Sequence, residues 1–207
     1  MAICCNVTWV FGEMLNLPDL VSDPFLALGV QWIGQNDDPD FQYPDFRTLL
    51  HARGVAELDE LDPFDEKATL RWNLNEPVPE SAHEHYATVF DIGCAEHIFD
   101  TRAVFENCLR MVKVGGHYAA HLPVCGHSDH GLHTFHSELV PRVLKANGFE
   151  MVYLKYTTQA GEEFIPGEGV NAGDGLVWAV GRKVKPLGAF RSPEQYRYDP
   201  EENVHVT

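Results

Sequence analysis

The chain has 207 residues, of which 44% are hydrophobic, so it is long enough for one globular domain with a sizeable core. Its 31 acidic and 15 basic residues give a formal net charge of −16, which disfavours binding to nucleic-acid phosphates or anionic lipids and favours a small-molecule substrate. No stretch approaches the roughly 18 apolar residues of a membrane span, and five cysteines without a C-x-x-C pair fit a cytoplasmic protein.

The N-terminal part is expected to begin with a peripheral segment, residues 1–22, that is helical around residues 10–17. After Pro24, a short apolar run ends at Gly29 and is typical of a buried parallel strand. A polar loop with turn residues follows this strand.

The next elements continue the alternation of helix and strand. Asp45 is placed to cap a helix that ends near Gly54. Residues 55–61 and 67–79 are predicted to form the second and third strands, the latter broken by prolines.

The middle of the chain has the strongest pattern. Residues 86–93 form an apolar strand, and Asp100 is placed to cap an amphipathic helix over residues 101–113. A Gly-Gly turn ends this helix, and residues 117–124 form a fifth strand. Ser137 or Thr134 is expected to begin the next helix.

Two further strands, 151–158 and 175–183, are joined by a loop and can add an antiparallel pair at the sheet edge. The sequence therefore predicts an α/β fold: a Rossmann-like, mostly parallel twisted sheet flanked by helices. The predicted domain spans residues 23–185, and 186–207 form a polar C-terminal tail. The edge pair also offers a surface for a homo-oligomer.

Polar residues gather where two predicted strands end. Asp91, Glu96 and His97 follow one strand, and histidines of the segment 121–136 follow the next. Ligands of open α/β sheets bind at these strand ends, so this is where a site is expected.

Several stretches, in this order, resemble class I S-adenosylmethionine (SAM) dependent methyltransferases. They are LALGVQ, LDPFDEKAT, WNLNEPVP, VFDIGCAEHIFDTRAVFENCLRMVKVGGH, HGLHTFHSELVPRVLKANGFE and VWAVGRKVKPL. More narrowly, they resemble a branch with short, unorthodox motifs that is often predicted to act in polysaccharide or natural-product pathways. The resemblance covers most of residues 25–190 and is strongest over 89–116.

The resemblance implies SAM as the cofactor and Gly29 and Gln31 as part of its site. The usual G-x-G-x-G motif is reduced here to Gly29, followed by Val30 and Gln31. Glycine permits close approach of backbone to the methionine part of SAM. Asp62, with Asp59 as the alternative, is implied to accept hydrogen bonds from the ribose hydroxyls, although either can be merely an exposed acid.

The family often has Asp-x-Asn near the adenine, and this chain has Asn73 and Asn75 at that place. The same asparagines can instead form a turn before Pro77. Asp91 and Gly93, at the end of the fourth strand, complete the implied cofactor-binding set.

His97 is the first candidate for a catalytic base that deprotonates an acceptor hydroxyl, and His130 is the second. For His97 the alternative is that it fixes its loop, and loop fixing is the expected role of Glu96.

Histidines are concentrated in the segment 117–136: His117, His121, His127, His130, His133 and His136. They allow two interpretations. A transition metal bound by imidazoles and a carboxylate is possible but not favoured, because no strict metal signature is present. The favoured interpretation is an acceptor-binding loop in which one or two histidines do acid–base work.

Three functions follow. The first is O-methylation of a small polar metabolite or a glycan or natural-product acceptor. The second is a degenerate methyltransferase-like scaffold or partner subunit, and the third is a metal-dependent enzyme that uses the histidines of residues 117–136.

Overall fold

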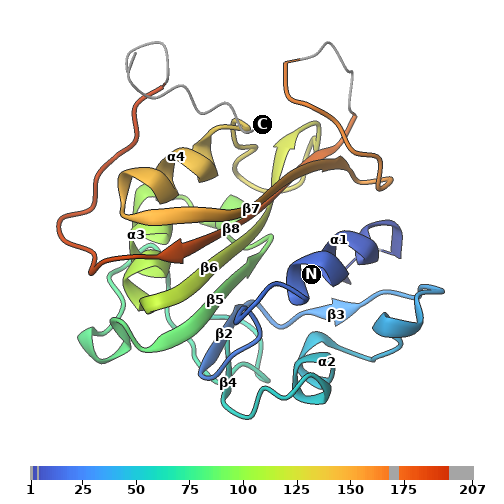
Figure 1. Ribbon diagram of the computed structural model, residues 1–207, viewed down its shortest axis with the longest axis horizontal. Helices are drawn as coiled ribbons and strands as arrows, with labels where there is room; N and C mark the ends of the chain where they lie inside the picture. Colours follow the sequence, from blue (N-terminus) through green and yellow to red (C-terminus); the bar gives the residue numbers. More distant parts are fainter. Residues whose placement is uncertain (1, 4, 168–172, 196–207) are drawn as a thin grey trace.

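A six-stranded sheet forms the centre of the molecule in the computed structural model, which describes residues 2–3, 5–167 and 173–195 (Figure 1). The strand order is β4-β2-β5-β6-β8-β7. The strands are β2 (Phe25–Leu28), β4 (Leu58–Leu61), β5 (Tyr86–Ile92), β6 (Val112–Cys125), β7 (Phe149–Thr158) and β8 (Gly175–Lys183). The first four strands of this order are parallel, and β8 is antiparallel to both β6 and β7. The predicted Rossmann-like sheet with an antiparallel edge pair is confirmed.

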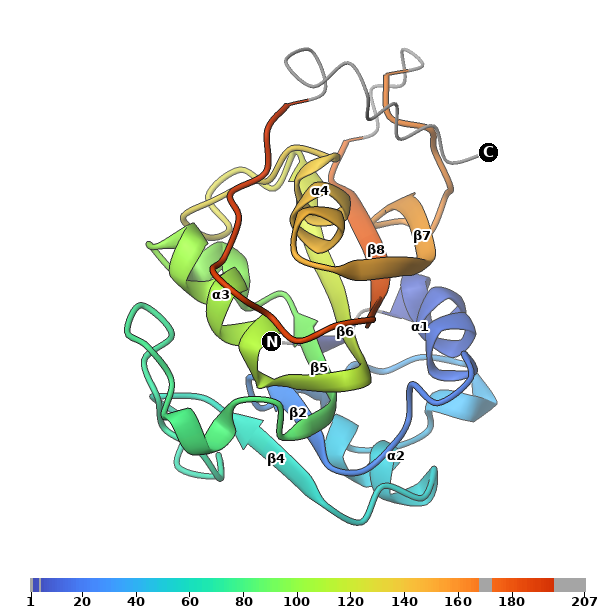
Figure 2. The same cartoon turned by 60° about the vertical axis from the view of Figure 1, so that its left-hand side comes forward.

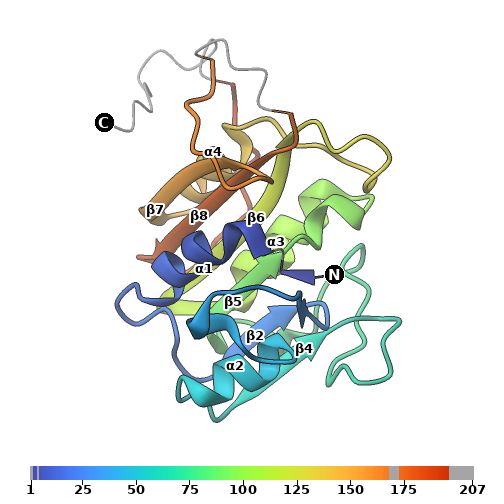
Figure 3. The same ribbon diagram turned by 90° about the vertical axis from the view of Figure 1, so that its right-hand side faces the viewer.

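Helices cover both faces of the sheet. The α-helices are α1 (Thr8–Leu15), α2 (Phe46–Ala52), α3 (Thr101–Met111) and α4 (Leu139–Ala146). Short 3-10 helices are η1 (Cys5–Val7), η2 (Pro39–Phe41), η3 (Glu80–Ala82) and η4 (Ala95–His97). Figure 2 shows α3 and α4 on one side of the sheet, and Figure 3, from the other side, shows α1 and α2 in front of it. None of these helices is long and apolar enough to span a bilayer.

Strand alternation divides the buried side chains into two cores, one for each face. Val89 of β5 packs in the core with α3 and α4, whereas the next residue, Phe90, packs in the core with α1 and α2. All seven residues of β5 are buried, as expected for a central parallel strand that is covered on both faces.

Two of the predicted helix starts are confirmed by side-chain caps. The Asp45 carboxylate accepts from the backbone N–H of Thr48 (2.7 Å), and that of Asp100 accepts from Ala103 (2.9 Å). The start of α4 was placed too early, because Glu138 occupies its N-cap position without a capping side-chain bond.

The predicted third strand over residues 67–79 is wrong. Only one parallel bridge, between Leu61 and Leu70, remains of it. The buried side chain of Asn107 in α3 takes the place of a neighbouring strand: its Oδ1 accepts from Val78 N, and its Nδ2 donates to the backbone oxygens of Leu74 and Glu76. A side chain from a helix therefore satisfies this backbone, and no ladder is needed.

The predicted N-terminal segment contributes to the core. Within it, α1 places Val10, Phe11 and Met14 in full burial against the sheet. The loop predicted after β2 contains a short strand, β3 (Trp32–Ile33), which pairs with β1 (Ala2–Ile3) in a separate two-stranded sheet. Of the predicted tail, residues 196–207 lie outside the described residues.

Candidate functional site

The strand order places a topological switch point between β2 and β5. The chain passes from β2 outward to β4 and then returns across β2 to β5. Leu28 is in register with Asp91, so the carboxyl ends of the two strands lie side by side. Ligands of open α/β sheets bind at such a point.

Gln31 occupies this switch point. Its Nε2 donates to the backbone oxygens of Leu28 (3.1 Å) and Ile92 (3.2 Å) and so joins the ends of the two strands. Its Oε1 is buried and has no hydrogen-bond partner within the described chain. Gly29 has φ +80°, and a Cβ there would lie 2.7 Å from Gln31 Nε2. The positive φ favours glycine at position 29, and any Cβ there would also displace the Gln31 side chain from its position.

Asp91 is fully buried and holds the turn after β5. One of its oxygens accepts from the N–H groups of Cys94 (2.8 Å) and Ala95 (3.3 Å), and the other accepts from the Tyr118 hydroxyl (3.0 Å). Burial raises the pKa of Asp91 to about 6, although these three hydrogen bonds oppose the rise. Gly93 donates its N–H to His121 O (2.9 Å).

The other predicted cofactor residues lie along the same edge. Asp62 directly follows β4, is half-buried, and uses Oδ1 to accept from Phe64 N and Asp65 N. In the alternative, Asp59, the two oxygens accept from Tyr86 and Thr69 hydroxyls within the protein. These bonds give Asp59 a structural role.

Asn73 and Asn75 form the turn that was the alternative to adenine binding. Asn73 Oδ1 accepts from the backbone N and the side-chain Nδ2 of Asn75. Asn75 Oδ1 accepts in turn from Asp100 N, the N-cap residue of α3.

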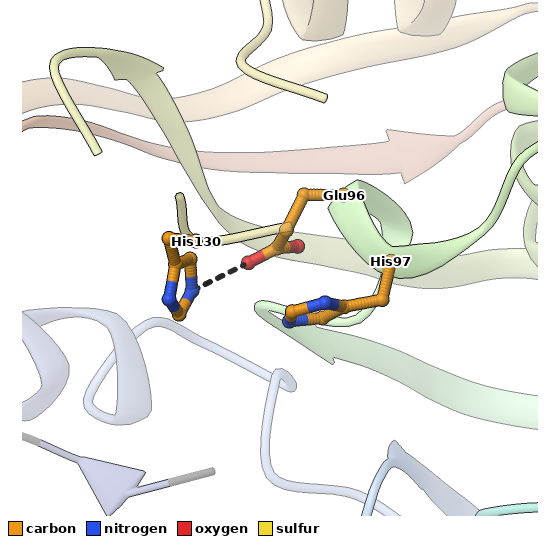
Figure 4. Close-up of side chains that lie close together, drawn as sticks. All are labelled: Glu96, His97 and His130. Atoms are coloured by element: carbon orange, nitrogen blue, oxygen red, sulfur yellow. Dashed lines mark ion pairs between the residues drawn. The ribbon is translucent and has the colours of Figure 1, made fainter. Parts of the chain in front are cut away.

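Glu96, His97 and His130 come together at the ends of β5 and β6 (Figure 4). One ligand atom from each lies within 4.8 Å of the others. The ring centroids of His97 and His130 are 5.3 Å apart, and His130 Nε2 lies 3.7 Å from Glu96 Oε1. We call these three residues the Glu96 cluster.

Backbone contacts bring the two parts of the cluster together. Glu96 and His97 belong to η4, whereas His130 lies in the loop after β6. Leu132 N (2.8 Å) and His133 N (3.1 Å) both donate to Glu96 O. Gly131 has φ +122° and packs so closely that a Cβ would lie 3.0 Å from Glu96 Cγ.

Burial differs sharply within the cluster. The Glu96 side chain is 2% exposed and that of His130 is 46% exposed. Burial, and then the nearby carboxyl group of Asp91, raise the pKa of Glu96 to about 8. Burial and the neighbouring His130 lower the pKa of His97, which keeps its imidazole neutral near pH 7. The sequence indicated only a loop-fixing role for Glu96. Its position directly before His97 was the signal that it could also belong to the site.

The other histidines of residues 117–136 lie in different surroundings. The His127 ring lies 5.8 Å from that of His130. His121 packs against Trp178, with ring centroids 4.1 Å apart, and burial lowers its pKa to about 3. His117 is at the opposite end of β6, where it pairs with Arg182 across the sheet. His133 contacts Phe99 O, and His136 accepts from Glu138 N.

An open cavity of about 740 Å³ lies along the segment after Gln31. It is lined by residues of the range 33–43 together with Asn6, and none of the predicted site residues is among them. The insertion between β2 and α2 thus forms a polar hollow of its own.

No protein-family model matches the sequence, and no curated protein matches it. Solved structures do match. An S-adenosylmethionine dependent methyltransferase from Mesorhizobium loti has a TM-score of 0.54 and 15% identity over 84% of this chain and 96% of that one. The 1,6-didemethyltoxoflavin-N1-methyltransferase of Burkholderia thailandensis, bound to 1,6-didemethyltoxoflavin and S-adenosylhomocysteine, has a TM-score of 0.52 and 10% identity, covering 86% and 84%. The [4+2]-cyclase SpnF has a TM-score of 0.51 and 15% identity, covering 79% and 75%.

The chain therefore has the class I SAM-dependent methyltransferase fold. At these identities the likeness establishes the fold and leaves the reaction and the acceptor open.

Proposed function

We propose that the chain is a SAM-dependent methyltransferase that modifies an oxygen atom of a small polar metabolite or of a glycan or natural-product acceptor. The observation that carries the proposal is the buried, unpartnered Oε1 of Gln31 at the switch point between β2 and β5, as far as the described residues go. A buried acceptor without a donor is costly and suits a ligand that brings one. The ammonium group of SAM is such a donor.

The residues along this edge fit the cofactor. Gly29 and Gln31 would hold its amino-acid part. Asp62 retains Oδ2 for the ribose hydroxyls, since its turn bonds use Oδ1. Asn73, Asn75 and Gly93 lie on the same side of the sheet as parts of turns. Asp91 would act by shaping the turn, since both its oxygens already accept hydrogen bonds.

When bound, SAM supplies a methyl group activated by its sulfonium. The chain would contribute alignment of the acceptor and removal of its proton. The neutral imidazole of His97 can accept that proton, and the exposed ring of His130 lies beside it. Glu96 Oε1 lies 3.7 Å from His130 Nε2 and would orient the second ring once the two atoms approach to hydrogen-bond distance.

The test is calorimetric titration of the purified protein with SAM and with S-adenosylhomocysteine. We expect micromolar binding that is lost in Gly29→Val and strongly weakened in Asp62→Asn, which keeps an oxygen for the turn but loses the charge. Glu66→Gln, an exposed acid in the same turn, should bind normally. No binding by the folded wild-type protein at millimolar ligand would overturn the proposal.

One observation favours the second candidate, a methyltransferase-like scaffold without catalysis. The Gln31 side chain bonds to the ends of β2 and β5 at the position of the family's glycine-rich motif. Only Gly29 remains of that motif. The likeness to a [4+2]-cyclase also shows that this fold carries other activities. The scaffold hypothesis predicts no SAM binding, together with a loss of stability in Gln31→Met, because the variant loses the two bonds that join the strand ends.

A further inference from the structure

We propose that the Glu96 cluster is a binding site for one divalent first-row transition-metal ion, with Glu96, His97 and His130 as its three protein ligands. The proposal does not depend on methyl transfer. It starts from the convergence of one carboxylate and two imidazoles at the strand ends, where ligand atoms of all three lie within 4.8 Å of one another (Figure 4).

The spacing is close to that of a loaded site. Ligand atoms bound to zinc at about 2.1 Å in a tetrahedral arrangement lie about 3.4 Å from each other. The distances between ligand atoms of the cluster, which are at most 4.8 Å, must therefore shorten by no more than about 1.4 Å. His97 and His130 are both exposed, so rotation of their side chains can supply this change without disturbing the core.

Glu96 is the independent observation that points to a cation. Its side chain is 2% exposed, and Oε2 is buried with no donor in the part of the chain that the structure describes. His130 Nε2 is 3.7 Å from Oε1, too far for a hydrogen bond. A buried Oε2 without a donor is unfavourable, and once the carboxyl group is ionised it needs an accompanying cation.

The other buried carboxylates lack this deficit. Asp91 accepts from two backbone N–H groups and a tyrosine hydroxyl. Glu60 is paired with Arg47, whose Nε donates to it at 2.9 Å. Among the buried carboxylates of the described residues, the unsatisfied one is thus the one that faces two imidazoles.

The ligand set defines the class of ion. Two imidazoles and one carboxylate suit zinc, iron, cobalt or nickel, whereas magnesium and calcium prefer oxygen ligands. Three protein ligands leave coordination positions open, and the exposure of both histidines turns these positions toward solvent. An oxygen atom of an acceptor can occupy such a position, and the ion then facilitates loss of its proton, a role that the free His97 imidazole has in the protein without the ion.

The test uses tag-free full-length protein that has been stripped with a chelator. Co²⁺ is added and followed by its visible absorption, and Zn²⁺ affinity is measured by competition with a chromophoric chelator. We expect one ion per chain and a d–d spectrum of a site with nitrogen and oxygen ligands. Loss of an outer partner typically weakens a metal site about 10–100-fold, so Glu96→Gln, His97→Ala and His130→Ala should each weaken binding by more than about 100-fold.

His133→Ala is the matched control, since His133 lies three residues from His130 but outside the cluster, with its ring against Phe99 O. It should bind both ions as the wild type does. His130→Ala removes an exposed side chain, so it remains folded even if Glu96→Gln does not.

Absence of stoichiometric Co²⁺ and Zn²⁺ binding by the folded wild type would overturn the proposal. Equal binding by wild type and all three cluster variants would overturn it as well. SAM titration of the same stripped protein is a separate measurement, so failure of the metal site and failure of the proposed function can be told apart.

Discussion

Two ionisable side chains are buried at opposite ends of the sheet, and they differ in what surrounds them. Lys183, fully buried at the end of β8, donates from Nζ to the backbone oxygens of Leu109 (3.1 Å) and Val112 (2.7 Å) and pairs with Glu84 (3.2 Å). Glu96, beyond β5, is 1% exposed and leaves Oε2 without a donor in the described residues.

The difference separates an ionisable group whose hydrogen bonds are all made within the protein from one with an oxygen left over. Lys183 joins the end of α3 to the start of β6, and all its partners come from the protein. Glu96 is held in place through its backbone oxygen, which leaves its carboxylate for something else. Unsatisfied buried charge costs stability, and proteins keep it mainly where function needs it.

The largest effect is expected for Lys183→Met. The methionine fills a similar volume but leaves two backbone carbonyls unpaired, so the free energy of unfolding should fall by about 4 kcal/mol. Urea denaturation measures it. Lys185→Met, an exposed control two residues away, should change stability by less than about 0.5 kcal/mol. If both variants lost the same amount, the bonds of Lys183 would not be structural.

Glu96→Gln should raise the free energy of unfolding relative to wild type, and this gain should appear only as the pH rises. Below pH 4.5 the acid is protonated in both states; between 4.5 and about 8 the unfolded chain loses the proton while the folded protein keeps it, so wild-type stability falls. Glutamine does not ionise, so the stability of the variant does not fall in this way. Between pH 5 and 8 its stability should therefore gain about 3 kcal/mol relative to wild type.

This gain is measured by urea unfolding in chelator at several pH values. Glu66→Gln, at an exposed position, is the control and should show an offset that does not change with pH. A constant offset for Glu96→Gln would mean that its carboxylate is not raised in pKa.

Local patterns were enough for most of the fold. Continuous apolar runs predicted β5 and β8, and acidic caps predicted α2 and α3, because these signals lie within a few residues of the element they define. The strand predicted over 67–79 failed because the partner of that backbone is Asn107, a side chain about thirty residues further along.

The location of the candidate site could be predicted from the sequence, but only some of its residues could. His97 and His130 were expected near the strand ends, and they do lie together. The part of Glu96 was not evident, because it depends on the packing of Gly131 against Glu96 and on burial, neither of which the sequence displays. His117 and His121 share a strand face, but four residues of extended chain place them about 13 Å apart.

His121 offers a smaller, acid-dependent effect at the same end of the sheet. Its pKa is about 3 in the folded protein against 6.5 ordinarily, so below pH 6.5 the unfolded state takes up a proton that the folded state refuses. Wild-type stability should therefore fall by about 2 kcal/mol between pH 7.5 and 5 from this residue. His121→Leu should remove that part of the slope in urea unfolding, whereas His136→Leu, in the exposed loop, should leave the slope unchanged. Parallel slopes for wild type and His121→Leu would rule out a neutral buried His121.

The smallest effect isolates the contact that closes the Glu96 cluster. Gly131→Ala and Gly115→Ala both place a side chain at positive φ, +122° and +85°, but only the first Cβ meets another residue: it would lie 3.0 Å from Glu96 Cγ, whereas the second meets nothing within 4 Å. Both variants carry backbone strain, and Gly131→Ala adds the close contact and a φ further from the left-handed region, so it should be less stable than Gly115→Ala by about 1 kcal/mol. The NMR titration of His97 should shift only in Gly131→Ala, because only there does the Glu96 side chain have to move. Equal stability and an unchanged His97 titration would show that the loop after β6 does not position Glu96, and the contrast with the tightly bonded Lys183 would then rest on the missing donor to Glu96 Oε2 alone.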